Sequence, residues 1–144
     1  MPRTIGIAIK RASNSMQRFT EHQAKKLGLT GVQMSIIDFI SREENQRDIF
    51  QLDVEQEFNI QKSSATALLK LMEKRELIVR VAAPKDNRFK RIILTPKTRE
   101  LLPQIKKIYA EDDQILHEIL DQDYQTTLNS LNTIIQFFNA KMRK

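Results

Sequence analysis

A basic segment between Asn59 and Arg91 carries the side chains of this chain that are best suited to contact a polyanion. It contains nine Lys and Arg residues and three acidic residues, a local balance of +6 that equals the net charge of the whole chain. Small hydroxyl residues and a glutamine stand beside lysines from Gln61 to Lys70. Short hydroxyls let a helix backbone approach base edges, Gln can pair with adenine, and Lys contacts phosphate or guanine. These residue types predict binding to nucleic acid.

The first part of this segment predicts a helix over residues 61–75 with one buried and one polar side. The apolar residues that recur at helical spacing are Ala65, Leu68, Leu69 and Met72. The residues predicted to contact DNA from the other side or from the helix start are Gln61, Lys62, Ser63, Ser64, Thr66 and Lys70. Taken alone, these residues fit an ordinary solvated helix surface about equally well, because hydroxyls are common at helix starts.

The second part predicts a β-hairpin with a basic tip. Two β-branched runs, residues 78–81 and 91–94, enclose a turn over residues 84–90. An arginine at such a tip can enter the minor groove, where negative potential is concentrated. The residues predicted to contact DNA from the hairpin are Lys85, Asp86, Arg88, Lys90 and Arg91. Two roles are open for Asp86: its carboxylate orients the Arg88 guanidinium, or the residue only forms the turn.

The elements before this segment predict a helix-turn-helix. Thr30 and Gln33 have the spacing of a capping box and start a helix with an apolar face. A short acidic helix follows and ends near Asn59, which can adopt the left-handed conformation of a tight turn. Two helices joined by such a turn place the second one for insertion into the major groove.

Narrow apolar stripes at both ends of the chain predict long amphipathic helices. Apolar residues step by three or four from Ile5 to Phe19 and again from Tyr124 to Met142. Residues 96–120 predict a further helix, with a kink or a shifted start at Pro103 and a break at Asp121. For the first stripe, packing within one core and contact between subunits are about equally supported. The two stripes together favour a shared dimerisation layer.

The composition indicates one globular domain and excludes several classes of protein. The chain has 144 residues, 40% of them hydrophobic, with three Gly and four Pro. The lack of Cys excludes disulfides and thiolate metal sites. No apolar run approaches the ~18 residues that span a bilayer, so the expected location is the cytoplasm, or the nucleus if the source has one. Because no catalytic motif is present, the chain is predicted to be neither an enzyme nor dependent on a cofactor.

Two histidines are the candidates for a metal site. His22 has Glu21 beside it, and His117 has Glu118. Isolated histidines on different helices are weak evidence, and solvated or interface histidines are favoured by roughly five to one. No metal site is therefore predicted.

The order of elements and three motifs resemble the MarR family of winged-helix transcriptional regulators. The motifs are Leu29-Thr30-x-x-Gln33, Glu73-Lys74-x-x-Leu77-Ile78, and Pro84-x-Asp86-x-Arg88 followed by Leu94-Thr95. The last is the most specific, because its spacing fits the family's wing and the exit into a helix. This chain departs from the common pattern at Ala67, Glu76 and Asn87, where many members have Arg, Gly and Arg. The operator sequence can therefore not be taken from a relative.

The resemblance implies a mainly α fold with a small β-hairpin, a winged helix-turn-helix with terminal helices that form a dimerisation layer. It divides a single domain over 1–144 into a DNA-binding lobe over 30–95 and a helical dimerisation region over 1–28 and 96–144. It implies a homodimer on an inverted-repeat operator in double-stranded DNA. The helix over 61–75 would lie in the major groove and Arg88 in the minor groove.

Relatives in this family often bind small aromatic or phenolic anions between the two regions. The candidates here for lining such a pocket are Met16, Phe19, Met34 and Phe39, although this spacing is also typical of core residues. The leading hypothesis is a dimeric, sequence-specific transcriptional regulator, with a repressor released by a small ligand favoured. The alternative is a helical protein–protein interaction module whose basic winged-helix lobe binds an acidic partner.

Overall fold

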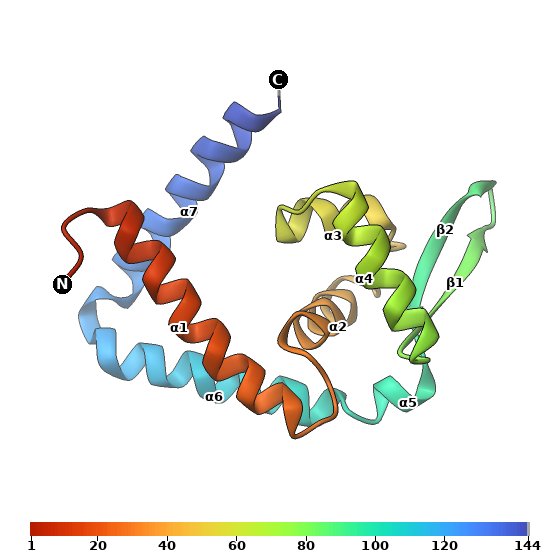
Figure 1. Ribbon diagram of the computed structural model, residues 1–144, viewed down its shortest axis with the longest axis horizontal. Helices are drawn as coiled ribbons and strands as arrows, with labels where there is room; N and C mark the ends of the chain where they lie inside the picture. Colours follow the sequence, from red (N-terminus) through yellow and green to blue (C-terminus); the bar gives the residue numbers. More distant parts are fainter. Residues whose placement is uncertain (144) are drawn as a thin grey trace. The chain divides into compact units, whose positions relative to one another are not determined.

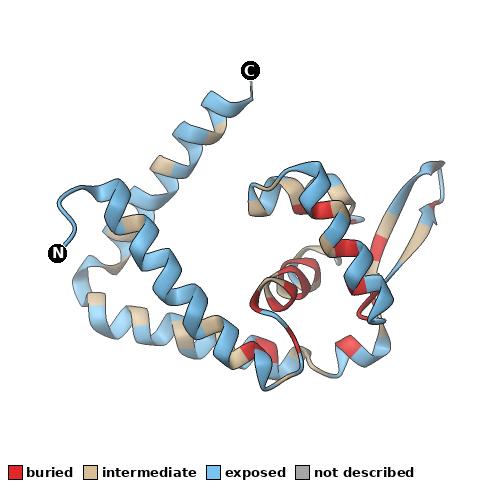
Figure 2. Cartoon of the chain, viewed as in Figure 1, coloured by how far each residue is buried: buried red, intermediate tan, exposed pale blue. Residues whose placement is uncertain are grey.

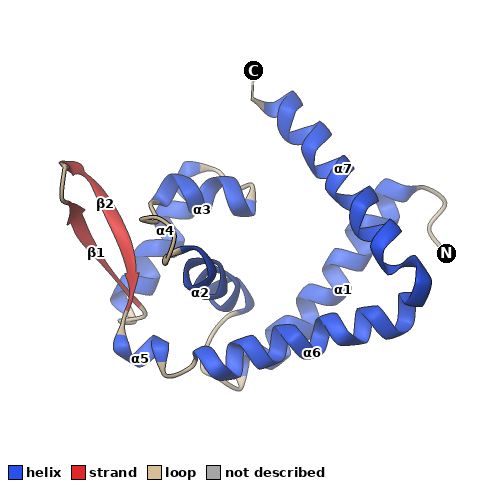
Figure 3. Ribbon diagram, turned by 180° about the vertical axis from the view of Figure 1, so that it is seen from behind, coloured by secondary structure: helices blue, strands red, loops and turns tan. Residues whose placement is uncertain are grey.

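The computed structural model describes residues 1–143, and of Asp86 and Asn87 it describes the backbone alone. The described chain is mainly helical with one antiparallel hairpin, as predicted (Figure 1). The first elements are α1 (Ile5–Lys25), α2 (Gly31–Glu43), α3 (Gln51–Phe58), α4 (Lys62–Lys74), β1 (Ile78–Ala83) and β2 (Asp86–Leu94). They are followed by α5 (Pro96–Arg99), α6 (Leu102–Leu120), a 3-10 turn η1 (Asp121–Asp123) and α7 (Tyr124–Met142). Figure 3 shows the two paired strands beside the helices.

Contacts divide the chain into two compact units, Met1–Lys106 and Lys107–Lys144. The first unit holds α1 to α5, the hairpin and the start of α6, and the second holds the rest of α6 with α7. The predicted division into a DNA-binding lobe and a dimerisation region stays a prediction.

Helix α2 lies at the centre of the core of the first unit (Figure 2). Its start is the predicted capping box: the Thr30 hydroxyl accepts from the Gln33 N–H at 3.1 Å, and the Gln33 amide oxygen accepts from the Thr30 N–H at 3.0 Å. The core side chains come from α2 (Met34, Ile36, Ile37, Ile40), from α4 (Ala65, Leu69, Met72) and from the hairpin (Ile78, Ile92, Leu94).

Helices α3 and α4 form the predicted helix-turn-helix. Asn59 ends α3 with a left-handed φ of 51°, and the Ile60 N–H donates to the Glu55 carbonyl at 3.1 Å. Asn is enriched at positive φ, so a local preference supports the sharp turn. At the other end of α3, the Asp53 carboxylate accepts from the Phe50 N–H at 2.8 Å.

The hairpin is held on both edges of β2. Strand β1 pairs with it so that Arg80 lies opposite Ile92 and Val81 opposite Arg91, and the register becomes irregular beyond Ala82, toward the tip. On the other edge, the Ile92 N–H donates to the Ile49 carbonyl at 2.7 Å. Paired residues share a face of the sheet, so Arg80 and Ile92 lie on the face opposite to Arg91.

The helix predicted over residues 96–120 is divided into α5 and α6. Thr95 caps α5 by accepting from the Thr98 N–H at 3.3 Å, and Pro96 occupies the first helical position. Helix α6 begins at Leu102, which is the predicted shifted start. Pro103 then lies in the first turn, where the N–H that proline lacks has no intrahelical partner.

In the second unit, Asp121 has a left-handed φ of 50° at the predicted break between two helices. Beside the break, the Tyr124 hydroxyl donates to Asp113 Oδ1 at 2.6 Å, and its ring stacks on His117 with the centroids 3.5 Å apart. This hydrogen bond to a carboxylate raises the pKa of Tyr124. Among residues 1–143, no helix has the length and apolar character required to cross a bilayer.

Candidate nucleic-acid interface

The outward face of α4 lies directly opposite its buried side. Ser63, Ala67, Lys70 and Lys74 step by four, three and four, and all are exposed. Ser63 and Lys70 were predicted as contacts, whereas Ala67 and Lys74 were not. The signal was available in the sequence, because the residues farthest around the helix from Ala65, Leu69 and Met72 can be found from a period of 3.6.

The start of α4 is open to an anion. Gln61 is the N-cap residue and its side chain makes no capping hydrogen bond. The first turn contains no acidic residue, and Gln61, Lys62, Ser63 and Ser64 are all exposed. The first N–H groups of a helix lack intrahelical partners and attract negative charge. A phosphate can therefore be held by backbone N–H groups with Lys62 beside them.

Thr66 lies on the flank of α4 that faces α3, and it is half-buried. Its hydroxyl donates to the Lys62 carbonyl at 2.9 Å and accepts from Gln51 Nε2 at 2.8 Å. The only hydroxyl proton is thus used within the protein. The structure places the predicted contact Thr66 against Gln51 and away from the outward face that carries Ser63 and Lys70.

At the wing, three of the predicted basic residues are exposed: Lys85, Arg88 and Lys90. The Arg88 guanidinium carbon lies 5.7 Å from the centroid of the Phe89 ring. That ring is itself more than half exposed, and it packs edge-on against Phe50 with the centroids 6.4 Å apart. The cation is therefore held near the hairpin by an aromatic face. The side chain of Asp86 lies outside the described residues, so its two predicted roles stay open.

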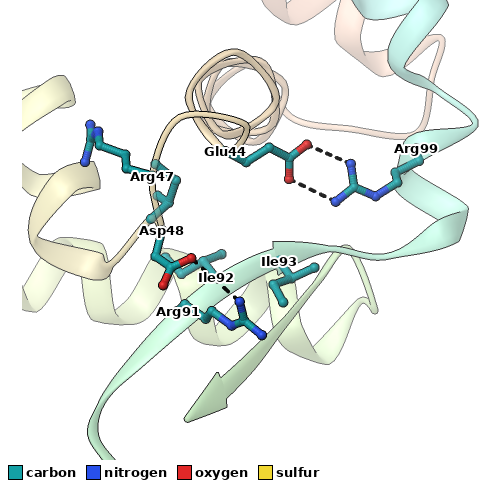
Figure 4. Close-up of a pocket in the computed structure, with 8 residues that line it drawn as sticks. Glu44, Arg47, Asp48, Arg91, Ile92, Ile93 and Arg99 are labelled. Carbon is teal, nitrogen blue, oxygen red and sulfur yellow. Dashed lines mark hydrogen bonds and ion pairs between the residues drawn. The ribbon is translucent and has the colours of Figure 1, made fainter. Parts of the chain in front are cut away.

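Arg91 lies near the base of the wing and contacts the segment before α3. It is half-buried, with Nη1 3.6 Å from Asp48 Oδ1. Figure 4 shows this pair and the Glu44–Arg99 pair, and the residues of both line a cavity of about 190 Å³. Arg99 donates two hydrogen bonds to Glu44, at 2.7 and 2.9 Å, and the hydrogen bonding raises the pKa of Arg99. Arg91 thus differs from Arg88 and Lys90, because it points to the other face of the hairpin and pairs with Asp48.

The residues considered for an effector pocket differ in how far they are buried. Met34 and Phe39 are buried, and Phe39 packs edge-on against Phe58. Met16 and Phe19 are half exposed on α1. In the part of the chain that the structure describes, no three His, Cys, Asp or Glu side chains are arranged to hold a metal ion.

Comparison with known proteins adds an independent line of evidence. A family model described as "MarR family" matches residues 27–88. The solved structure of the transcription regulator MarR from Oenococcus oeni PSU-1 is 36% identical with a TM-score of 0.81, over 92% of this chain and 99% of that chain. The solved transcriptional repressor CouR, bound to a 23-mer DNA duplex, is 28% identical with a TM-score of 0.75, over 92% of each chain.

A curated relative matches a shorter stretch. The HTH-type transcriptional regulator BilQ from Clostridioides difficile (strain CD3) is 29% identical over 83 residues. The match covers 57% of this chain and 56% of that regulator, a little over half of its length.

Proposed function

This chain belongs to the MarR family of DNA-binding transcriptional regulators, and we propose that it is a homodimeric repressor that binds an inverted-repeat operator. Membership of a family of regulators also confirms the prediction that the chain is not an enzyme. We place its action in the cytoplasm, where such a regulator meets chromosomal DNA.

The observation that carries the proposal is the outward face of α4 together with the basic wing. Ser63 and Ala67 are small, so the backbone of α4 can approach base edges, and Lys70 beside them can reach guanine or phosphate. The uncapped start of the helix offers N–H groups to a phosphate. Lys85, Arg88 and Lys90 on the wing supply positive charge for a neighbouring groove.

Uncovered apolar side chains support the homodimer. In α1, Ile5, Met16 and Phe19 are at least half exposed. In α7, the stripe of Leu128, Leu131, Ile135, Phe138 and Met142 is exposed along its whole length. Covering a large apolar side chain contributes roughly 1.5–3 kcal/mol, so such stripes favour association. A second copy of the chain would cover both stripes. Binding to successive turns of DNA then requires the two copies of α4 to lie about 34–36 Å apart.

A small aromatic or phenolic effector that releases the DNA belongs to the same proposal. Support for such an effector comes only from the membership of this chain in the MarR family. Because Met34 and Phe39 are buried in the core, they are poor candidates for its contacts.

Fluorescence anisotropy with the DNA upstream of the protein's own gene tests the proposal. We expect saturable binding whose logarithmic affinity falls by roughly 0.9 for each neutralised phosphate per log unit of salt. Lys70→Ala and Arg88→Ala should each weaken binding by about 1–3 kcal/mol. Lys107→Ala, which removes an exposed charge from α6, is the matched control and should bind as the wild type does. Equal affinity of all four proteins would refute the interface, and binding to an acidic protein instead would favour the alternative.

A further inference from the structure

The segment Asp48–Gln51, which leads into α3, touches the hairpin through each of its four residues. Asp48 pairs with Arg91, the Ile49 carbonyl accepts from the Ile92 N–H, and Phe50 packs against Phe89. Gln51 Oε1 accepts from Arg80 Nη1 at 3.4 Å. The position of the wing is therefore set by this segment as well as by its own strand pairing.

Gln51 differs from the other three residues because its amide also reaches α4. Its Nε2 donates to the Thr66 hydroxyl at 2.8 Å and lies 3.4 Å from the Lys62 carbonyl. Nε2 also donates to Glu55 at 3.3 Å within α3. The acceptor end of one side chain thus bonds to the wing, and the donor end bonds to the helix that carries the outward face.

A second contact joins the same two elements. Arg80 Nε lies 3.3 Å from Glu73 Oε1, near the C-terminal end of α4. The Arg80 side chain is only 18% exposed and that of Glu73 is 39% exposed, so the Arg80 end of this ion pair and its hydrogen bond to Gln51 are the better shielded from water. Shielded polar contacts hold a geometry more firmly than exposed ones, because their loss leaves buried groups without partners.

We propose that Gln51 is a positioning residue for DNA recognition, which fixes the spacing between α4 and the wing by bonding to both. This inference rests on the proposed function. Specific binding needs α4 and the wing tip to reach their grooves together, whereas non-specific binding needs only positive charge. A rigid link between α4 and the wing reduces the conformational entropy that is lost on specific binding. The Gln51 amide accepts from Arg80 and donates to Thr66 at once. An ionised Glu has no proton to donate, and Met offers no comparable donor or acceptor, so neither reproduces both hydrogen bonds.

The experiment compares Gln51→Met with Gln56→Met, the same change at an exposed glutamine of the same helix. Each protein is titrated with the upstream DNA and with an unrelated duplex of equal length, at one salt concentration. The loss of one hydrogen bond corresponds to a change of roughly 5- to 10-fold in an equilibrium constant. Gln51→Met should therefore reduce the ratio of the affinities for the upstream DNA and the unrelated duplex by about that factor. Its affinity for the unrelated duplex should stay within about 2-fold, and Gln56→Met should match the wild type in both.

A double-mutant cycle with Thr66→Val separates positioning from a direct contact of Thr66 with DNA. If Gln51 acts through Thr66, the double variant should be no worse than Gln51→Met alone, because both changes remove the same hydrogen bond. Additive losses would overturn the inference, and so would equal weakening on both duplexes or an unchanged preference in Gln51→Met. A wild-type protein that does not distinguish the duplexes would instead overturn the proposed operator binding.

Discussion

Helices α2 and α7 of this chain use their apolar residues in opposite ways. Helix α2 buries Met34, Ile36, Ile37 and Ile40 completely, together with residues from α4 and the hairpin. Within the described residues, α7 has no buried side chain, although its apolar stripe is as regular. An apolar stripe contributes to stability only when another surface covers it and removes it from water. The lobe around α2 thus buries its apolar residues within one chain, whereas the stripe of α7 is left exposed, as the proposed dimer would require.

The largest difference is expected when the same substitution, Ile to Ala, is made in both helices. Ile37 is fully buried, and Ile37→Ala should lower the free energy of unfolding by about 2–5 kcal/mol because it leaves a cavity. Ile135 is 54% exposed, so Ile135→Ala should cost far less at a protein concentration below that of dimerisation. Urea unfolding followed by circular dichroism measures both. Equal losses would mean that α7 is packed within a single chain.

A charge placed on the stripe of α7 should act on assembly. Phe138 is 59% exposed, and Phe138→Asp should raise the dimer dissociation constant by roughly 30-fold or more, as expected for a large aromatic contact. Sedimentation over a range of concentrations measures this change. Gln136→Asp adds the same charge at an exposed polar position two residues away and should leave the dimer intact. A wild-type protein that sediments as a monomer would contradict the dimer outright.

Helix caps give a smaller contrast between the regions. Thr30→Ala removes the part-buried cap of α2, the central helix of the core, with a 3.1 Å hydrogen bond, and should cost about 1–2 kcal/mol of unfolding free energy. Thr4→Ala removes a longer, exposed cap of 3.4 Å at the start of α1 and should cost less than about 0.5 kcal/mol. Thermal unfolding of the two variants under identical conditions compares them. A larger effect at Thr4 would show that the start of α1 is more constrained than its exposure indicates.

The smallest effect is expected from the Glu44–Arg99 pair. Arg99 is 42% exposed, so Arg99→Gln should cost about 0–1 kcal/mol. The pKa of Arg99 is raised on folding, so its contribution is present at every pH below its unfolded value and is lost only in strong alkali. The difference between wild type and variant should therefore be the same at about pH 7 and about pH 9. A difference that changes between these two pH values would point to another titrating group.

Local features of the sequence predicted the elements well. The Thr30 and Gln33 spacing, the left-handed Asn59 and the break at Asp121 were all found as expected. These features depend on residues within a few positions of one another, so their backbone preferences can be read directly from the sequence.

The candidate interface was predicted less completely. Residue type and periodicity identified α4 and the wing, but Thr66 turns toward Gln51 and Arg91 toward Asp48. Their partners lie 15 and 43 positions away along the chain, so no local pattern reports them. Whether any of the predicted residues contacts DNA stays a prediction for the titrations above.

The amino-acid sequence alone determined the helical class, the turn, the wing and the concentration of charge. These features depend on propensity and periodicity, which are properties of neighbouring residues. Packing in three dimensions assigned each basic or hydroxyl side chain of that segment to the solvent or to an internal bond. The reason is physical: a hydrogen bond between Gln51 and Thr66 forms only when the tight turn at Asn59 brings α3 against α4.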